Sequence, residues 1–322
     1  MSEHFPSHDD FIRNILSNKE IAIEYFKSYL PDFVSERLDF SQLIQLPDTY
    51  LSDELKKTMS DIVYSCGLKG GKGSIKVSLL IEHKSHPDKY TLVQVGGYLF
   101  SAYQKQIQNK EPLSLVIPVV LYHGKAKWQH RTLANLFEGI DKEWEQFIPS
   151  FEYIYNDLGR LSDSEIEALN NKFLAASFLA LKHSQEKEWL EQNTAGLLVL
   201  ASEGPKGLTK SFIIYLYSRG KLEEKVLNSL PDPIKKDVMN TLDIYIEKGR
   251  KEGFEKGIEK GIEKGIEKGR IEGRVEGIEK GKEQIVQNLI NTGKFTVPEI
   301  ANLAGVPEAF VKRVRSSMSK KN

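Results

Sequence analysis

The sequence predicts an α/β protein with an N-terminal core in the order helix, three strands, helix, strand, followed by a mainly helical region. Three observations support this fold class. Two apolar, β-prone runs flank a turn rich in glycine and lysine, a dense β-branched run follows a helical segment, and helical spacing dominates from residue 163 to residue 245. With 322 residues, of which 40% are apolar, the chain can form a real core and is long enough for two domains.

The first core element is a helix. Apolar residues recur at helical spacing from residue 9 to residue 30, and Pro31 ends the pattern. Asp9 and Asp10 open this helix, where they are candidates either for N-capping or for an additional acidic group in a site. A short extended segment is expected at 38–46.

A hairpin is expected next. The apolar runs at 62–66 and 75–81 surround the glycine- and lysine-rich turn at 69–73, which predicts two antiparallel strands. Lys72 and Lys76 belong to this turn region and are candidates for contacts with a phosphate backbone, with a solvated hairpin tip as the alternative.

The core closes with a helix and a strand. The helix is expected at 90–107, and the β-branched run at 113–121 is typical of a buried strand. Pro118 lies inside this run, and because proline cannot donate a backbone hydrogen bond, it predicts a sheet edge or a bulge.

A repeat follows the helical region. Nine glycines recur at every fourth residue from Gly249 to Gly281, with Gly-Ile-Glu-Lys as the commonest unit. Each glycine inside a helix costs roughly 0.8–1 kcal/mol relative to alanine, so the set costs on the order of 8 kcal/mol. The repeat is therefore expected to form either a marginal helix stabilised by a second chain or a flexible charged tether.

The C-terminal residues resemble a helix-turn-helix. Apolar residues precede Gly305 at helical spacing, and a second helix follows it. Lys312, Arg313 and Arg315 would lie on this second helix and are candidate DNA contacts. A small packing or dimerisation unit is the somewhat favoured alternative.

Composition limits the class of protein. The 45 basic and 45 acidic residues balance, so any polyanion-binding surface must be local. The single cysteine, Cys66, excludes an internal disulfide and suits a reducing compartment. The sequence shows no signal-peptide pattern and no apolar run of about 20 residues, so we expect a cytoplasmic protein that does not span a membrane.

Three charged residues lie in or beside the hairpin strands. Side chains alternate along a strand, so Glu82 and Lys84 point to one side, and Asp61 can join them from the neighbouring run. Two carboxylates and an ammonium could hold Mg²⁺ and activate a water for attack on a phosphodiester. Alternatively, Asp61 caps a turn and Glu82 pairs with a surface lysine. His83 faces the other side and is expected to be structural, whereas His123 is a weak candidate for a DNA contact.

The pattern Asp61…Glu82-x-Lys84 resembles the PD-(D/E)XK nuclease superfamily, whose core has the order helix, three strands, helix, strand. More narrowly, the chain resembles the recombination-promoting nuclease family, whose members also carry a transposase label. Gln94 and Tyr98 match a Gln-x-x-x-Tyr signature of some superfamily branches. Two positions depart from these patterns: many relatives have glutamine where this chain has Lys84, and Ser60 replaces the usual proline before the first acid. Further matching segments are His8–Phe11, Asp61–Tyr64, Ile81–Ser85 and Ile117–Gly124 with Trp128.

The resemblance implies a Mg²⁺-dependent DNA endonuclease with a part in RecA-independent recombination. Asp61 and Glu82 are then the metal ligands, Lys84 orients the attacking water, and Gln94 contacts that water or the phosphate, unless it is a plain surface residue. We expect a homodimer, with one active site for each DNA strand. The alternative is a catalytically lapsed nuclease fold that binds DNA or assembles with itself. The expected segments are a nuclease core at 1–145, a helical extension at 146–247, the repeat at 248–284 and a small helical unit at 285–322.

Overall fold

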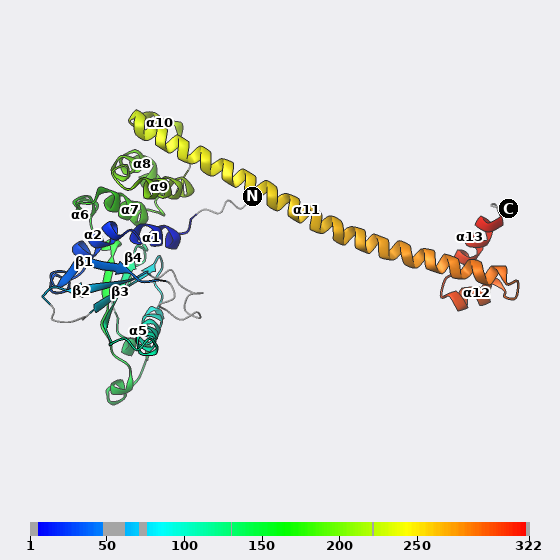
Figure 1. Cartoon of the computed structure of the whole chain (residues 1–322), viewed down its shortest axis with the longest axis horizontal. Helices are drawn as coiled ribbons and strands as arrows, with labels where there is room; N and C mark the ends of the chain where they lie inside the picture. The colour runs from blue at the N-terminus through cyan, green and yellow to red at the C-terminus, as the bar shows by residue number, and fades with distance from the viewer. Residues whose placement is uncertain (1–5, 48–61, 71–75, 130, 221, 320–322) are drawn as a thin grey trace. The chain divides into compact units, whose positions relative to one another are not determined.

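The computed structural model describes residues 6–47, 62–70, 76–129, 131–220 and 222–319, with the backbone alone for residues 76–80. The chain divides into two compact units, residues 2–246 and residues 247–322. In the first unit, a five-stranded sheet formed by the N-terminal half is followed by a series of helices (Figure 1). The α/β class and the helical region expected from the sequence are both present.

The sheet is mixed, with the strands in sequence order. The strands are β1 (Leu38–Gln45), β2 (Ile62–Leu68), β3 (Lys76–Lys84), β4 (Leu115–Tyr122) and β5 (Ile154–Asp157). β1, β2 and β3 are antiparallel neighbours, whereas β4 runs parallel to β3 and β5 runs parallel to β4. The predicted hairpin is confirmed, and its register pairs Ile62 with Ile81.

Two expectations about the last strands need correction. β4 is a central strand between β3 and β5 and not an edge strand, but β5 does not reach as far as Pro118, which pairs only with β3. The pairing of β4 with β5 begins at Val119, immediately after the proline, so the missing N–H falls outside that ladder. β5 itself was not predicted, because a strand of four half-buried residues shows no clear period.

The helices of the first unit precede, interrupt and follow the sheet. They are α1 (His8–Leu16), α2 (Lys19–Tyr29), α3 (Asp32–Ser35), α5 (Thr91–Gln108), α6 (Asp163–Glu167), α7 (Lys172–Lys182), α8 (Lys187–Ala201), α9 (Lys206–Arg219) and α10 (Glu224–Ser229), with short 3₁₀ turns at Leu133–Leu136, Lys142–Phe147 and Leu158–Arg160.

The single N-terminal helix expected from the sequence is two helices. Asn18 lies between α1 and α2, and its side-chain oxygen accepts hydrogen bonds from the backbone N–H groups of Glu20 and Ile21. This N-cap starts a new helix within an unbroken apolar pattern. Ser7 and Asp10 form a capping box at the start of α1, which confirms the N-capping interpretation for Asp10.

Each face of the sheet has its own core. Alternate residues of β2 point to opposite faces of the sheet. Ile62 and Tyr64 belong to the large core with α1, α2 and α7, whereas Val63 belongs to the small core with Leu99 of α5. Ile81 of β3 belongs to the large core. The period of two along β3 therefore directs Glu82 toward the α5 face and His83 toward the α1 face.

The second unit is helical. α11 (Asp232–Asn291) begins in the first unit, runs through the whole glycine repeat and leads to α12 (Val297–Ala304) and α13 (Glu308–Ser319). A small core between these three helices contains Val286, Ile300 and Val311. Gly305 has φ +60°, so the predicted glycine turn between α12 and α13 is confirmed. The repeat is helical in this structure.

Among the described residues, no helix combines the length and the apolar character that crossing a bilayer requires.

Candidate active site

The C-terminal end of β3 holds a buried carboxylate. Glu82 is 4% exposed, and it lies beside Val120 of β4 in the parallel register. A buried carboxylate is stable only when it is paired or metal-bound. Its partner is Lys84, two residues further along the same strand and on the same face.

Lys84 is the centre of a polar cluster. Its Nζ lies 2.9 Å from Glu82 Oε1 and donates a hydrogen bond of 2.9 Å to Gln94 Oε1. The same Nζ is 3.7 Å from Asp88 Oδ2. The structure therefore brings together three predicted elements of the site, Glu82, Lys84 and Gln94.

The loop between β3 and α5 positions the partners of Lys84. Asp88 Oδ1 accepts a hydrogen bond of 2.9 Å from the backbone N–H of Tyr90, immediately before α5 begins at Thr91. This contact fixes the start of the helix, and Gln94 follows in its first turn. Sequence reasoning missed Asp88, although an aspartate just before a helix start is a common turn signal.

Three of the predicted residues cannot be placed. Asp61 and Lys72 lie outside the described residues, and the side chain of Lys76 does too, although its backbone belongs to β3. The described part of β2 begins at Ile62, which pairs with Ile81, the residue before Glu82.

The other face of the same strand carries a histidine cluster. His83 is 7% exposed, its Nδ1 donates a hydrogen bond of 2.6 Å to Asp9 Oδ1, and its ring stacks on that of His123 at 4.8 Å between centroids. His8 contacts His123 edge-on at 4.9 Å and shares a hydrogen bond of 2.8 Å with the hydroxyl group of Tyr215. His83 thus lies on the face opposite Glu82, as expected, and Asp9 contacts this cluster across the sheet from Glu82.

Burial suppresses protonation of His8 and His123. Desolvation, reinforced by Arg219, lowers the pKa of His8 to about 4. Desolvation, reinforced by His83, lowers the pKa of His123 to about 3. The hydrogen bond from His83 lowers the pKa of Asp9. His123 is 3% exposed and its Nδ1 donates to the Leu181 carbonyl, so its predicted role as a DNA contact is wrong.

The C-terminal candidates lie on α13, in the second unit. Lys312 forms an ion pair of 3.5 Å with Glu308, and Arg313 donates a hydrogen bond of 3.4 Å to Glu279 of α11. Arg315 is exposed, and its side chain forms no ion pair among the described residues. The three side chains share one helix, as predicted, but acidic neighbours offset two of the charges.

The donor set near Glu82 suits a hard cation, because Glu82 and Asp88 supply carboxylate oxygens of the kind that Mg²⁺ prefers. Within the described residues, no group of three or more histidine, cysteine, aspartate or glutamate side chains could hold a metal ion. A metal site here therefore requires a further ligand, and water molecules usually complete the coordination of Mg²⁺.

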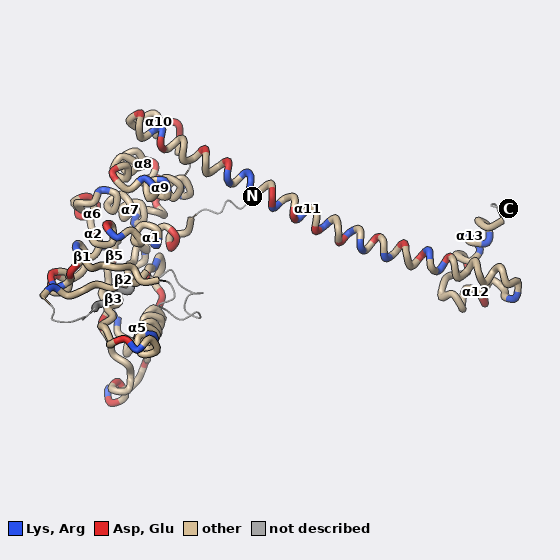
Figure 2. Tube along the Cα trace, in the orientation of Figure 1, with Lys and Arg blue, Asp and Glu red and all other residues tan. Residues whose placement is uncertain are grey.

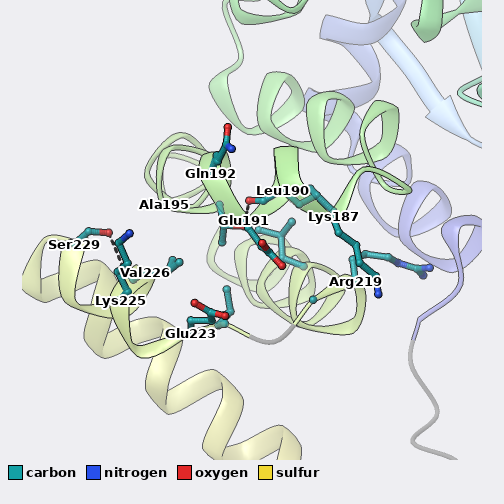
Figure 3. A pocket seen from close by; sticks show the side chains of 14 residues that line it. Lys187, Leu190, Glu191, Gln192, Ala195, Arg219, Glu223, Lys225, Val226 and Ser229 are labelled. Atoms are coloured by element: carbon teal, nitrogen blue, oxygen red, sulfur yellow. Dashed lines mark hydrogen bonds between the residues drawn. The ribbon is translucent and has the colours of Figure 1, made fainter.

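A separate cavity of about 660 Å³ lies between α8, α9 and α10 (Figure 3). Charged side chains of both signs, including Lys187, Glu191 and Glu223, surround its apolar floor. No described residue of the candidate site lines it, so it does not bear on the chemistry at Lys84.

Comparisons with known proteins extend these observations. A family described as "Putative transposase, YhgA-like" matches residues 6–206. Recombination-promoting nuclease RpnD of Escherichia coli O157:H7 is 26% identical over 56% of this chain and 69% of its own length. RpnC of Escherichia coli K12, with the same description, is 25% identical over 67% of this chain and 72% of its own length.

A further relative shows that the resemblance does not guarantee activity. The protein named inactive recombination-promoting nuclease-like protein RpnE, from Escherichia coli K12, is 23% identical over 56% of this chain and 60% of its own length. No solved structure matches the chain significantly. The family match covers more than half of the chain and includes every residue of the Lys84 cluster. The chain is also distantly similar to the recombination-promoting nucleases. The family match shows that the protein belongs to the YhgA-like putative transposase family.

Proposed function

We propose that the protein is a Mg²⁺-dependent DNA endonuclease with a PD-(D/E)XK-type core. The contact of Lys84 with both Glu82 and Gln94, each at 2.9 Å, is the observation that carries this proposal. It joins an acid and a cation from the end of β3 with an amide from the first turn of α5. The names of the relatives support nuclease activity and extend the proposal to a part in recombination, of the RecA-independent kind that the family resemblance implies.

Asp61 is the proposed second acid. The chain joins it to Ile62, and Ile62 pairs with Ile81 beside Glu82. Continuing this antiparallel register by one residue would set Asp61 opposite Glu82, and directly opposed residues project to the same face of a sheet. Glu82 and Asp61 would then hold Mg²⁺, with Asp88 as the nearest further carboxylate.

The described side chains have separate roles in this proposal. Mg²⁺, when bound, would offset charge on the scissile phosphate and favour deprotonation of the attacking water. Lys84 would donate to the attacking water or to a phosphate oxygen and stabilise the negative charge that develops there. Gln94 holds Lys84 through its amide oxygen, which leaves the amide N–H₂ group available to DNA or water.

Incubation of the purified chain with supercoiled plasmid tests this function. We expect nicking in Mg²⁺ that chelation abolishes, and that Asp61→Ala and Glu82→Ala each remove while the circular dichroism spectrum is retained. Glu203→Ala, which changes an exposed acid between α8 and α9, is the matched control and should cut normally. Equal cutting by Glu82→Ala and the wild type would refute the site.

A catalytically lapsed DNA-binding protein is the second candidate, favoured by the inactive relative and by the neutralisation of Glu82 through its own neighbour Lys84. It predicts salt-dependent DNA binding without cleavage in Mg²⁺ or Mn²⁺. Binding and cutting measured on the same preparation distinguish the two candidates. Absence of both would contradict a role in DNA metabolism.

A further inference from the structure

The segment that follows β4 carries a local excess of positive charge. Basic and acidic residues alternate along α11 (Figure 2), and over the whole chain their numbers are equal. Between residues 112 and 137, in contrast, the chain contains Lys125, Lys127 and Arg131 and no acidic residue. All three basic residues are exposed. Because the chain has no net charge, a polyanion can be attracted only where such an excess is local.

We call residues 124–129 and 131 the basic loop, and this loop begins beside Lys84. Lys84 pairs with Tyr122 in the parallel register of β3 and β4. Side chains of directly paired residues project to the same face of a sheet, so Tyr122 shares the α5 face with Glu82 and Lys84. Trp128 of the loop contacts the Tyr122 ring edge-on, at 5.1 Å between centroids. The basic loop therefore lies on the face of the sheet that carries the Lys84 cluster.

Side chains near the sheet hold the basic loop in one conformation. Three tyrosine hydroxyl groups form hydrogen bonds with its backbone: Tyr122 donates to the Ala126 carbonyl at 2.6 Å, Tyr155 donates to the Trp128 carbonyl at 3.1 Å, and Tyr153 accepts from the Arg131 N–H at 3.1 Å. At Gly124 the loop passes so close to the backbone of Ser85 that a Cβ would clash with the Ser85 carbonyl oxygen. A loop fixed in this way loses little conformational entropy when its side chains bind a ligand.

Two charges of the basic loop are unmatched. Lys127 and Arg131 form no ion pair within the ranges that the structure describes. Lys125 differs, since its Nζ lies 3.4 Å from a carboxylate oxygen of Glu186. Lys127 and Arg131 are therefore the side chains that are available to an external anion.

We propose that the basic loop binds the phosphodiester backbone of duplex DNA beside the cut site, an inference that rests on the proposed nuclease function. Lys127 follows Tyr122 by five residues, a length of chain that spans at most about 18 Å. With about 5 Å between neighbouring strands, the backbone of Lys127 lies within about 23 Å of that of Lys84. About seven base pairs of B-DNA cover this length, so one duplex can contact both sites. Backbone contacts carry no sequence information, so the loop positions DNA without selecting its sequence.

Binding of a labelled duplex, followed by fluorescence anisotropy at several salt concentrations, tests the loop without cleavage. The measurement is made in a chelator and again in Ca²⁺. We expect Lys127→Gln/Arg131→Gln to lower the slope of the logarithm of affinity against the logarithm of salt concentration by about 0.9 for each lost contact, or about 1.8 in all. The decrease should be equal for two duplexes of unrelated sequence, because the contacts are with phosphates.

Lys206→Gln/Lys210→Gln is the matched control, because it removes two exposed charges from α9. Its slope should equal that of the wild type. An unaltered slope in the Lys127→Gln/Arg131→Gln chain would overturn the proposal, as would a wild type that binds neither duplex.

Plasmid nicking by the same variants separates this inference from the proposed function. Lys127→Gln/Arg131→Gln should raise the KM for DNA by about tenfold or more, with a smaller effect on the maximal rate, since its residues contact DNA away from the cut. A wild type that binds through the loop but cuts no DNA would refute the nuclease function and support the loop. A wild type that cuts, with a loop variant of unchanged slope and KM, would refute the loop and support the nuclease.

Discussion

Glu82 and Lys84, two residues apart on β3, place Oε1 and Nζ 2.9 Å from each other on the α5 face of the sheet. The Glu82 side chain is 5% exposed and that of Lys84 17%, so the pair is largely removed from water. An ion pair in such a position contributes little net stability, because desolvation of both charges offsets their attraction. A preorganised pair is what the proposed active site requires, because Lys84 would then already be aimed at the position of the reaction.

Glu82→Gln should separate activity from folding. The amide has nearly the same shape but removes the negative charge, so cutting should fall by about 100-fold or more, the scale of losing one stabilising group in an active site. Lys84 keeps its contacts with Gln94 and Asp88, so we expect destabilisation of only about 1–3 kcal/mol. Plasmid nicking and urea unfolding of the same preparation measure the two effects. Unfolded Glu82→Gln protein would show that the pair is chiefly structural.

Lys84 allows a graded test. Lys84→Gln retains an N–H₂ donor and should keep part of the activity, whereas Lys84→Met has the length without a donor and should abolish it. Lys84→Met should also be the less stable variant, because it leaves Glu82 as an unpaired buried charge. Nicking rates and melting temperatures provide the comparison. Equal activity of the two variants would argue against hydrogen-bond donation by this side chain.

The histidine cluster predicts loss of stability in mild acid. The pKa values of His8, about 4, and His123, about 3, lie below the unfolded value of 6.5. Between these values the unfolded chain binds protons that the native protein does not, so the free energy of unfolding falls as pH drops below about 6.5. The pKa of Asp9 is lowered from 3.8, so its contribution is lost in more acidic solution.

Melting temperatures measured from pH 8 down to pH 5, where Asp9 stays ionised, give the slope caused by the histidines. His8→Gln should reduce this slope, and the exposed residue change His86→Gln should not. A melting temperature that is independent of pH over this range would contradict the buried, neutral state of His8 and His123.

The basic residues of α13 predict a measurable salt effect if they contact DNA. Each phosphate contact adds about 0.9 to the slope of the logarithm of affinity against the logarithm of salt concentration. Replacing Lys312, Arg313 and Arg315 together by glutamine should therefore lower the slope by up to about 2.7. Lys142→Gln, an exposed change in the first unit, is the control. An unchanged slope would assign α12 and α13 to packing or assembly.

The sequence was informative where one local pattern decides the structure. The period of two along β3 predicted that Glu82 and Lys84 share a face, and the glycine-rich turn predicted the hairpin. The break at Asn18 was hidden, because a side-chain cap interrupted an apolar pattern that continues across it. The contact of Gln94 with Lys84 was not predicted, because it depends on where Asp88 starts α5; the sequence suggested Gln94 only as a contact of the water or the phosphate, or as a surface residue.

Other features depend on contacts between distant segments. His8, His83 and His123 come from α1, β3 and the end of β4, and no spacing along the chain relates them. Their shared burial follows from the packing of three elements against one face of the sheet. Asp61 is the opposite case: the sequence suggests it as a metal ligand, but it lies outside the described residues, which resume at its neighbour Ile62.

The repeat glycines predict a gain in stability on substitution. A Cβ added at Gly257 or Gly261 would meet no atom within 4 Å, so alanine fits at both positions. Each change should stabilise α11 by about 0.8–1 kcal/mol through the lower conformational entropy of the unfolded chain. Circular dichroism should show higher helicity and a higher melting temperature for the double variant.

Gly305→Ala is the control variant, because the same change of glycine to alanine should lower stability at this position. This residue has φ +60°, a conformation that costs alanine about 1 kcal/mol, so the second unit should lose stability. The same circular dichroism measurement separates the two effects, because alanine relieves an entropic cost at Gly257 and Gly261 and introduces backbone strain at Gly305. A melting temperature that Gly305→Ala leaves unchanged would contradict the left-handed conformation between α12 and α13.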